Sequence, residues 1–344
     1  MTQPSNNKKP IIGITIGDIN GIGIEVIIKT FSDARMCQML TPVIYGSSKI
    51  ISYYRKALKA EHFNYYQIKH LDQLNPGKVN VLNCWEENVS INVGSITSEG
   101  GKYAFLSLKA ATDDLLQGSI DALVTAPINK KNIQQSDFAF PGHTEYLTQR
   151  SQSKDSLMLL IAQGFRVGVV TGHIPLKEVS GEITKEQLHG KIKLLEQSLK
   201  KDFQISKPRI AVLGLNPHAG DQGLLGSEEE EIIVPVIDQL KEKGKLIFGP
   251  YSADGFFGTG NYTQFDGILA MYHDQGLAPF KALAFDQGVN FTAGLPVIRT
   301  SPDHGTGYNL AGKGLADEGS FRASVFAALD IIKTRQSRLV PQDQ

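Results

Sequence analysis

The chain of 344 residues has little cysteine, no net charge and no long apolar run. Its two cysteines, Cys37 and Cys84, form no CxxC pair and indicate no disulfide framework. Lysine plus arginine number 35, as do aspartate plus glutamate, so no overall basic field favours nucleic acid or an anionic membrane. No apolar stretch reaches the roughly 18 residues that span a bilayer, and the polar start lacks the apolar core of a signal peptide. We therefore expect a cytoplasmic protein that binds neither nucleic acid nor membrane.

What the chain does contain is a regular alternation of short apolar runs and longer amphipathic stretches. The runs are rich in Val, Ile and Leu without strict polar alternation, as buried parallel strands require. They are 11–16, 41–45, 121–125, 166–171, 209–215 and 265–271. The amphipathic stretches that predict helices are 101–117, 184–201 and 228–243. This alternation predicts an α/β fold, and the length suits two domains of roughly 150 residues, interleaved because no linker is visible.

Two conspicuous local patterns favour structural roles. The glycines of 17–25 follow a predicted strand and open a helix, but their spacing is not GxGxxG, which argues against a standard Rossmann domain. The acidic run 227–231 is better explained by a helix start than by a metal site. Ser227 is expected to cap that helix and Glu230 to complete a capping box.

The most informative pattern is a histidine just past the end of three predicted strands. His173, His218 and His273 each follow an apolar run, and Gly or Pro stands close by. Ligands bind at this edge of open α/β sheets. Three neutral imidazoles suit a divalent ion, with Zn²⁺ first and Co²⁺, Mn²⁺ or Mg²⁺ as alternatives. Asp274 would be a further ligand, a partner of a ligand or a proton acceptor.

A second group supplies cationic and polar side chains. His143 and Thr144 follow a Pro-Gly turn, and Lys281, Asn290 and Arg299 lie in a region of little helical periodicity. Lysine and arginine near a metal site would hold a carboxylate or phosphate.

Together these motifs resemble the 4-hydroxythreonine-4-phosphate dehydrogenases, the PdxA family. The matching segments, between about residues 11 and 332, are 140–145, 171–173, 215–220, 271–277, 294–296 and 298–301. The resemblance implies an isocitrate/isopropylmalate-dehydrogenase-like fold, with two α/β/α domains separated by a cleft, and a homodimer. It implies a metal held by His173 and His218 of one subunit and His273 of the other. Substrate contacts would fall on His143, Thr144, Lys281, Asn290 and Arg299.

The resemblance also gives domain boundaries and a cofactor loop. The first domain would comprise 1–130 with about 296–344. The second, 131–295, would carry the metal histidines and the dimer interface. Segment 303–314 resembles the loop that binds the adenosine side of NAD or NADP in the wider superfamily. The residues expected to contact the cofactor are His304, Gly305, Thr306 and Asn309.

The implied reaction is NAD-dependent oxidation of 4-phosphohydroxy-L-threonine to 2-amino-3-oxo-4-(phosphonooxy)butanoate. Loss of CO₂ then gives 3-amino-2-oxopropyl phosphate for pyridoxal phosphate synthesis. Asp274, Asp254, Lys281 and metal-bound water remain candidates for the general base. Ile19 and Ile24 stand where the family has proline, and Gly255 where a threonine is expected. These departures keep open a dehydrogenase of threonate or erythronate 4-phosphate, and three histidines with water would also permit a hydrolase.

Overall fold

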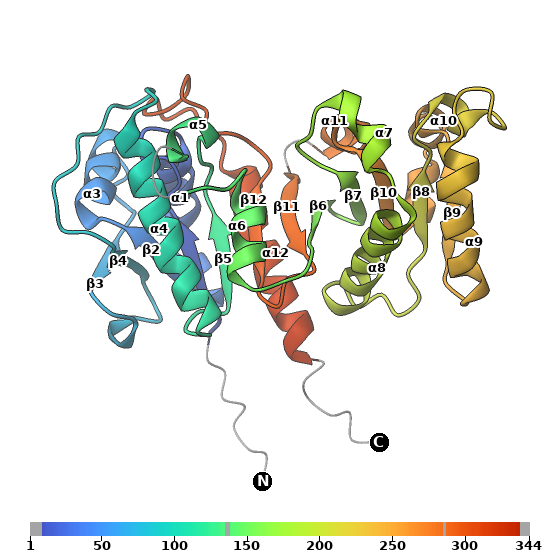
Figure 1. Cartoon of the computed structure of the whole chain (residues 1–344). Helices are drawn as coiled ribbons and strands as arrows, with labels where there is room; N and C mark the ends of the chain where they lie inside the picture. Colours follow the sequence, from blue (N-terminus) through green and yellow to red (C-terminus); the bar gives the residue numbers. More distant parts are fainter. Residues whose placement is uncertain (1–8, 135–137, 285–286, 338–344) are drawn as a thin grey trace, which may run out of the picture. The chain divides into compact units, whose positions relative to one another are not determined.

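The computed structural model describes residues 9–134, 138–284 and 287–337. The chain divides into two compact units (Figure 1). The first comprises 1–151 and 297–332, and the second comprises 152–296 and 333–344. Within the described ranges, no helix is both long and apolar enough to cross a bilayer.

The first unit is built on a parallel sheet with strand order β3-β4-β2-β1-β5-β12. Its strands are β1 (Ile11–Thr15), β2 (Thr41–Gly46), β3 (Tyr65–Ile68), β4 (Val79–Asn83), β5 (Ala122–Thr125) and β12 (Arg299–Pro302). Its helices are α1 (Gly23–Phe31), α2 (Met36–Met39), α3 (Ser48–Ala57), η1 (Leu71–Gln73), α4 (Ser98–Leu116), α5 (Lys130–Ile133), α6 (His143–Arg150) and most of α12 (Gly319–Ser337).

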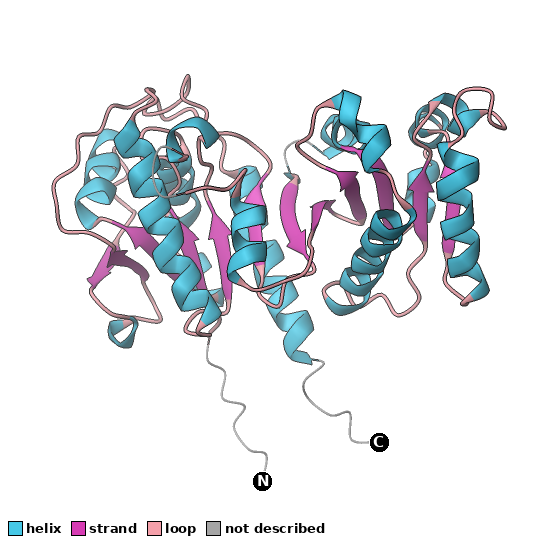
Figure 2. Cartoon of the chain, in the orientation of Figure 1, coloured by secondary structure: helices cyan, strands magenta, loops and turns pink. Residues whose placement is uncertain are grey.

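Helix α4 lies along β1, β2 and β5, as Figure 2 shows. Thr97 caps this helix by accepting a hydrogen bond from the Gly100 backbone nitrogen. Gly101 allows the backbone of α5 to approach, because a Cβ at this position would lie 2.2 Å from the Asn132 carbonyl oxygen. Every residue of β1, β2 and β5 is buried, as the continuous apolar runs predict for central parallel strands.

The second unit has the strand order β11-β6-β7-β10-β8-β9. Its strands are β6 (Leu157–Ala162), β7 (Phe165–Thr171), β8 (Ile210–Leu213), β9 (Ile247–Tyr251), β10 (Gly267–Tyr272) and β11 (Val289–Ala293). Its helices are α7 (Leu176–Glu182), α8 (Lys185–Lys201), η2 (Pro217–Gly220), η3 (Glu229–Ile233), α9 (Val234–Glu242), α10 (Ala253–Gly258), η4 (Asn261–Gln264) and α11 (His273–Ala284).

The strands predicted in this unit, β7, β8 and β10, are parallel as expected, but the sheet also contains strands that the sequence did not predict. Strand β6 pairs antiparallel with both β7 and β11, whereas β7, β10, β8 and β9 are parallel. Only Gln163 and Gly164 join β6 to β7, and Gly164 has φ +72°. A two-residue connection of this kind makes a hairpin, which forces antiparallel pairing.

Helices cover both faces of this second sheet. A Cβ on Gly276 of α11 would contact Val167 and Ala270, whereas one on Gly267 would contact Leu195 and Leu199 of α8. Because neighbouring residues of a strand point to opposite faces, α11 and α8 lie on opposite sides of β10. Because β7 and β10 are parallel, their carboxyl ends lie at the same edge of the sheet, where α11 begins.

The division differs from the expected boundaries at two points. The first domain was expected to end at residue 130, but the first unit continues through α6. Arg150 of this helix donates to Asp113 Oδ1 at 2.5 Å, and the Tyr146 ring centre lies 6.2 Å from that of Phe105. The end of α12 groups with the second unit instead of the first. There Arg335 donates to Asp202 Oδ1 at 2.8 Å. These long-range contacts are invisible in a local sequence pattern.

Candidate active site

Two of the three predicted histidines meet at one sheet edge of the second unit. His173 follows β7 and His273 opens α11 directly after β10, and Thr171 pairs with Tyr272 in the ladder between these strands. Their ring centres lie 5.4 Å apart. The expectation that histidines placed after parallel strands converge therefore holds for this pair.

Asp274 contacts the His273 ring. Its Oδ1 atom lies 2.6 Å from His273 Nδ1, and its carboxylate is 84% exposed. A carboxylate on Nδ1 favours a proton there and leaves Nε2 with its lone pair. Of the roles considered for Asp274, this contact supports that of a partner that orients an imidazole.

His218 lies on the loop after β8, in η2, with a left-handed backbone (φ 54°) and an exposed side chain. Asp254, on α10, is close enough for His218 to help lower the pKa of its carboxyl, although the hydrogen bond from Ser252 contributes most. A carboxylate with a lowered pKa is a weak proton acceptor at neutral pH. Asp254 is therefore an electrostatic neighbour of His218.

The donor chemistry of the histidine pair fits a divalent ion. Two imidazoles bound to one tetrahedral zinc have ring centres about 5 Å apart, close to the spacing of His173 and His273. Among the described residues, however, no group of three or more His, Cys, Asp or Glu side chains could hold a metal ion. Within the described residues, His173 and His273 thus lie together, without a third ligand that would complete the predicted set of three histidines.

A buried cation lies in the first unit. Arg299, on β12, is only 3% exposed, and its Nε and Nη2 atoms donate to Thr125 Oγ1 at 3.0 and 2.7 Å. Burial lowers the pKa of this guanidinium to about 10, and the carboxylate of Glu145 opposes that shift. Arg299 is therefore charged at neutral pH. Thr125, the last residue of β5, is a partner that sequence reasoning missed.

His143 belongs to the same group as Arg299. Burial, then the charges of Arg299 and Lys130, hold the pKa of His143 well below its usual range, so the ring is neutral at pH 7. Its buried Nε2 atom has no hydrogen-bond partner in the described part of the chain. His143 and Thr144 begin α6, where backbone N–H groups lack helical partners. This half of the predicted substrate set offers hydrogen bonds and positive charge to an anion.

The other two predicted substrate residues lie in the second unit. Lys281 lies on α11, the helix that starts with His273, so the expectation of little helical structure there is wrong. The pattern was hidden because Gly276 and Pro279 interrupt the helical sequence. Asn290 lies on β11, and its buried Oδ1 atom has no partner among the described residues. An orphaned polar atom of this kind indicates a place for a ligand or water.

The predicted cofactor loop is anchored to the glycine-rich turn after β1. The Ile22 backbone nitrogen donates to the Thr306 carbonyl at 2.9 Å, and a Cβ on Gly21 would lie 2.7 Å from the same oxygen. The glycines of this turn therefore serve close packing against the loop. Asn309 is exposed, and His304 Nδ1 lies 3.0 Å from the Gly305 carbonyl.

Asp18 connects the glycine-rich turn after β1 to the predicted cofactor loop. This buried carboxylate accepts hydrogen bonds from Tyr308 Oη and Asn132 Nδ2, both at 2.7 Å, and from the Asn20 backbone nitrogen at 2.9 Å. Burial and the bond to Asp18 raise the pKa of Tyr308. Sequence reasoning missed this role, although a carboxylate among glycines at a strand end was a usable signal.

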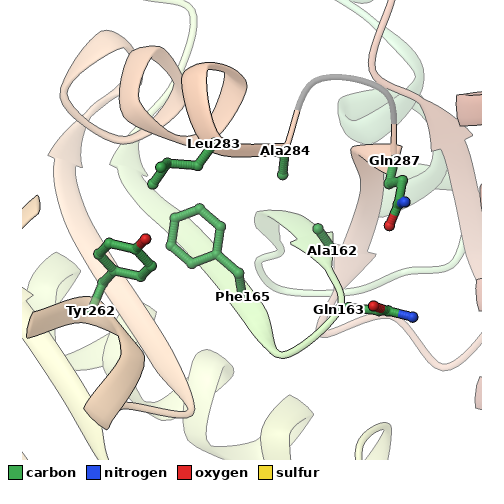
Figure 3. A pocket seen from close by; sticks show the side chains of 7 residues that line it. All are labelled: Ala162, Gln163, Phe165, Tyr262, Leu283, Ala284 and Gln287. Atoms are coloured by element: carbon green, nitrogen blue, oxygen red, sulfur yellow. The ribbon is translucent and has the colours of Figure 1, made fainter. Parts of the chain in front are cut away.

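A pocket of about 350 Å³ lies elsewhere in the second unit, and we do not assign it to this site (Figure 3). In Figure 3 the Phe165 ring lies between Tyr262 and Leu283. Phe165 opens β7, whereas His173 follows the carboxyl end of that strand. The pocket is thus at the amino end of the strand, and none of its lining residues is a predicted site residue.

Comparison with known proteins identifies the family. Residues 38–328 match the family model described as pyridoxal phosphate biosynthetic protein PdxA. A 4-hydroxythreonine-4-phosphate dehydrogenase of Bacteroides thetaiotaomicron is 54% identical, over 94% of this chain and 89% of its own. The chain belongs to the PdxA family. This membership confirms the family predicted from the motifs and places the chain among the dehydrogenase oxidoreductases.

Solved structures agree with this assignment. A crystal structure of the 4-hydroxythreonine-4-phosphate dehydrogenase of Klebsiella pneumoniae is 34% identical, with a TM-score of 0.81, over 95% of this chain and 99% of its own. The isocitrate/isopropylmalate-dehydrogenase-like α/β class is confirmed.

A further relative, similar in sequence, carries a different substrate in its name. This protein of Oceanobacillus iheyensis, provisionally named a D-threonate 4-phosphate dehydrogenase, is 36% identical over 96% of this chain and 100% of its own.

Proposed function

We propose that this chain is a cytoplasmic, homodimeric dehydrogenase that oxidises 4-phosphohydroxy-L-threonine with NAD. The product is 2-amino-3-oxo-4-(phosphonooxy)butanoate, a β-keto acid that loses CO₂ to give 3-amino-2-oxopropyl phosphate for pyridoxal phosphate synthesis. Family membership is the observation that carries the reaction, and the metal dependence rests on the imidazole donors that His173, His218 and His273 place after the ends of β7, β8 and β10.

In this proposal the metal residues are His173 and His218 of one subunit with His273 of the other. When bound, a divalent cation such as Zn²⁺ supplies positive charge to the substrate oxygen, and NAD or NADP accepts the hydride. The residues of the chain prepare both events. Asp274 holds a proton on His273 Nδ1 and orients the ring, so that Nε2 is available as a donor atom.

The substrate residues divide their tasks by charge. The buried guanidinium of Arg299 and the ammonium of Lys281 bind the anionic groups of the substrate. Neutral His143, together with Thr144 and Asn290, provides hydrogen bonds that select hydroxyl and amino groups. The buried Nε2 atom of His143 and Oδ1 atom of Asn290, which have no partner among the described residues, support this role. His304, Gly305, Thr306 and Asn309 bind the adenosine side of the cofactor, on the loop that Asp18 supports.

One absorbance assay tests this proposal. NADH should form when 4-phosphohydroxy-L-threonine and NAD are added to metal-loaded protein, and should stop forming after removal of the metal with a chelator. Restoration by Zn²⁺ or Co²⁺ separates metal loss from denaturation. A preparation without metal that keeps full turnover would contradict the metal dependence.

The second candidate is a dehydrogenase of threonate or erythronate 4-phosphate. Ile19, Ile24 and Gly255, which depart from the family pattern, and the similarity to the Oceanobacillus protein favour it. The same assay distinguishes the two candidates by which four-carbon phosphorylated acid gives the higher kcat/KM. A hydrolase would instead release phosphate without forming NADH.

A further inference from the structure

A buried carboxylate lies beneath the loop that carries His218. Glu229 is 2% exposed, although it belongs to the acidic run 227–231. Its Oε1 atom accepts hydrogen bonds from the backbone nitrogens of Leu215 and Asn216 at 2.7 and 2.8 Å. Its Oε2 atom accepts one from Asn216 Nδ2 at 2.9 Å. Glu229, to which the sequence assigned no role of its own, is therefore directed inward to the loop and not to its own helix.

The sequence around Glu229 adopts an uncommon helix geometry. Residues 229–233 form a turn of π-helix before α9, and no side chain caps its start. The extra residue per turn changes the directions of neighbouring side chains. Glu229 points inward while Glu230 and Glu231 are exposed. The predicted capping box of Ser227 and Glu230 is accordingly wrong.

The loop closes tightly around this carboxylate. A Cβ on Gly214 would lie 3.0 Å from Glu229 Oε1, and one on Gly220 would lie 2.8 Å from Oε2. Between these glycines, His218 and Ala219 have φ of +54° and +53°, a left-handed conformation that costs free energy in residues other than glycine. Such a conformation persists only when its surroundings fix it, and the hydrogen bonds to Glu229 fix the residues just before it.

We infer that Glu229 is a positioning residue for His218. Its hydrogen bonds fix the backbone at Leu215 and Asn216, and the fixed backbone sets the direction in which the His218 imidazole points from the loop. The inference rests on the proposed function, in which His218 binds the metal. A buried carboxyl group that accepts three hydrogen bonds is costly to replace, because the backbone nitrogens of Leu215 and Asn216 would lose their partner inside the protein.

Metal binding without turnover provides the test. Full-length protein freed of metal is titrated with Co²⁺, and binding is followed by the visible absorption of the ion. Glu229→Ala should weaken Co²⁺ binding about 10- to 100-fold, the usual effect of removing a group that orients a ligand. Glu229→Gln should fall between that variant and the parent, because one amide oxygen can still accept from both backbone nitrogens. Glu230→Gln, an exposed neighbour, is the matched control and should bind as the parent does.

A double-mutant cycle shows whether Glu229 acts through His218. If it does, Glu229→Ala should add no further loss in a protein that already carries His218→Ala. Hydrogen exchange gives an independent readout, in which the amides of Leu215 and Asn216 should lose protection in Glu229→Ala. If that variant does not fold, Glu229→Gln decides.

Two outcomes overturn the inference alone: parental Co²⁺ affinity in a folded Glu229 variant, or losses that add to that of His218→Ala. Parental affinity in His218→Ala overturns the proposed metal assignment, and the inference with it. The His218 single variant therefore distinguishes the two failures.

Discussion

Arg299 combines burial with a full charge, which makes it the clearest single residue to test. Its pKa, lowered to about 10 by burial, still leaves it protonated at pH 7. Arg299→Lys removes the planar fork and should raise the KM for the phosphorylated substrate. A charged hydrogen bond contributes about 1.5–3 kcal/mol, or roughly 10- to 150-fold. The KM for NAD should stay unchanged.

Steady-state kinetics with each ligand varied in turn measures this effect. Arg322→Lys is the control, because that arginine on α12 is 43% exposed and pairs with Glu318. Equal losses for substrate and NAD would remove Arg299 from the substrate site.

His143 gives a pH dependence whose sign is fixed by its environment. Its pKa in the folded state is lowered, chiefly by burial, while the unfolded chain titrates near 6.5. Below pH 6.5 the unfolded state binds a proton that the folded state refuses, so stability falls as the pH falls. The contribution of His143 is complete above pH 6.5 and is lost toward its lowered pKa.

Denaturant unfolding between pH 7.5 and 5 measures this slope. His143→Gln, which cannot titrate, should show a shallower dependence than the parent, and His62→Gln, which alters an exposed histidine, should not. Identical slopes in the parent and His143→Gln would contradict the shift.

Among the elements, the turn after β1 and the predicted cofactor loop behave as a linked pair. Asp18→Asn leaves one acceptor oxygen for three donors: if it faces Tyr308 and Asn132, the amide nitrogen meets the Asn20 backbone nitrogen, and if it faces Asn20, both side-chain donors lose their acceptor. Leaving a buried donor without an acceptor costs about 1–3 kcal/mol, so the variant should lose stability by that amount. It should also bind NAD more weakly while keeping its metal, because the support belongs to the first unit and the proposed metal histidines belong to the second.

Tyr308→Phe is the matched control for this change. It removes only the hydroxyl and should cost about 0.5–1.5 kcal/mol. Unfolding curves and NAD titration measure both effects. Parental NAD affinity in a destabilised Asp18→Asn protein would show that the contact serves stability alone.

Some elements were predictable because their signal is local. The runs before His173 and His273 are strands as predicted, and helices 101–117 and 184–201 match α4 and α8 closely. The antiparallel β6 and the helix carrying Lys281 were not predicted. Pairing direction follows from a short turn, and Gly276 and Pro279 disguise α11 as a loop. For β6 the local turn decides the pairing, whereas for α11 longer-range packing decides between states that the local sequence permits.

For the whole molecule, the decisive question is which chain supplies each histidine. His173 and His273 are neighbours within one chain, whereas the proposed metal set takes His273 from the second subunit. Subunits carrying His173→Ala and subunits carrying His273→Ala should each be inactive. After mixing, a hybrid dimer would contain one site with all three imidazoles.

Random exchange puts about half of the subunits in hybrid dimers, each with one intact site of two. Activity should therefore return to about a quarter of the parental value per site, since ligand sets act as units. Exchange is verified with two differently tagged chains. Complete exchange without recovered activity would show that each subunit builds its site from its own His173 and His273.

The sequence by itself determined the α/β class, the family and the identity of the candidate groups, because these depend on residue type, periodicity and short motifs. Only the tertiary structure decided which groups meet. It turned Glu229 inward while its acidic neighbours face solvent, buried Arg299 against Thr125, and made Asp18 the support of a loop far along the chain. The physical reason is that burial, hydrogen-bond partners and pKa shifts are set by residues distant in sequence, whose approach no local pattern records.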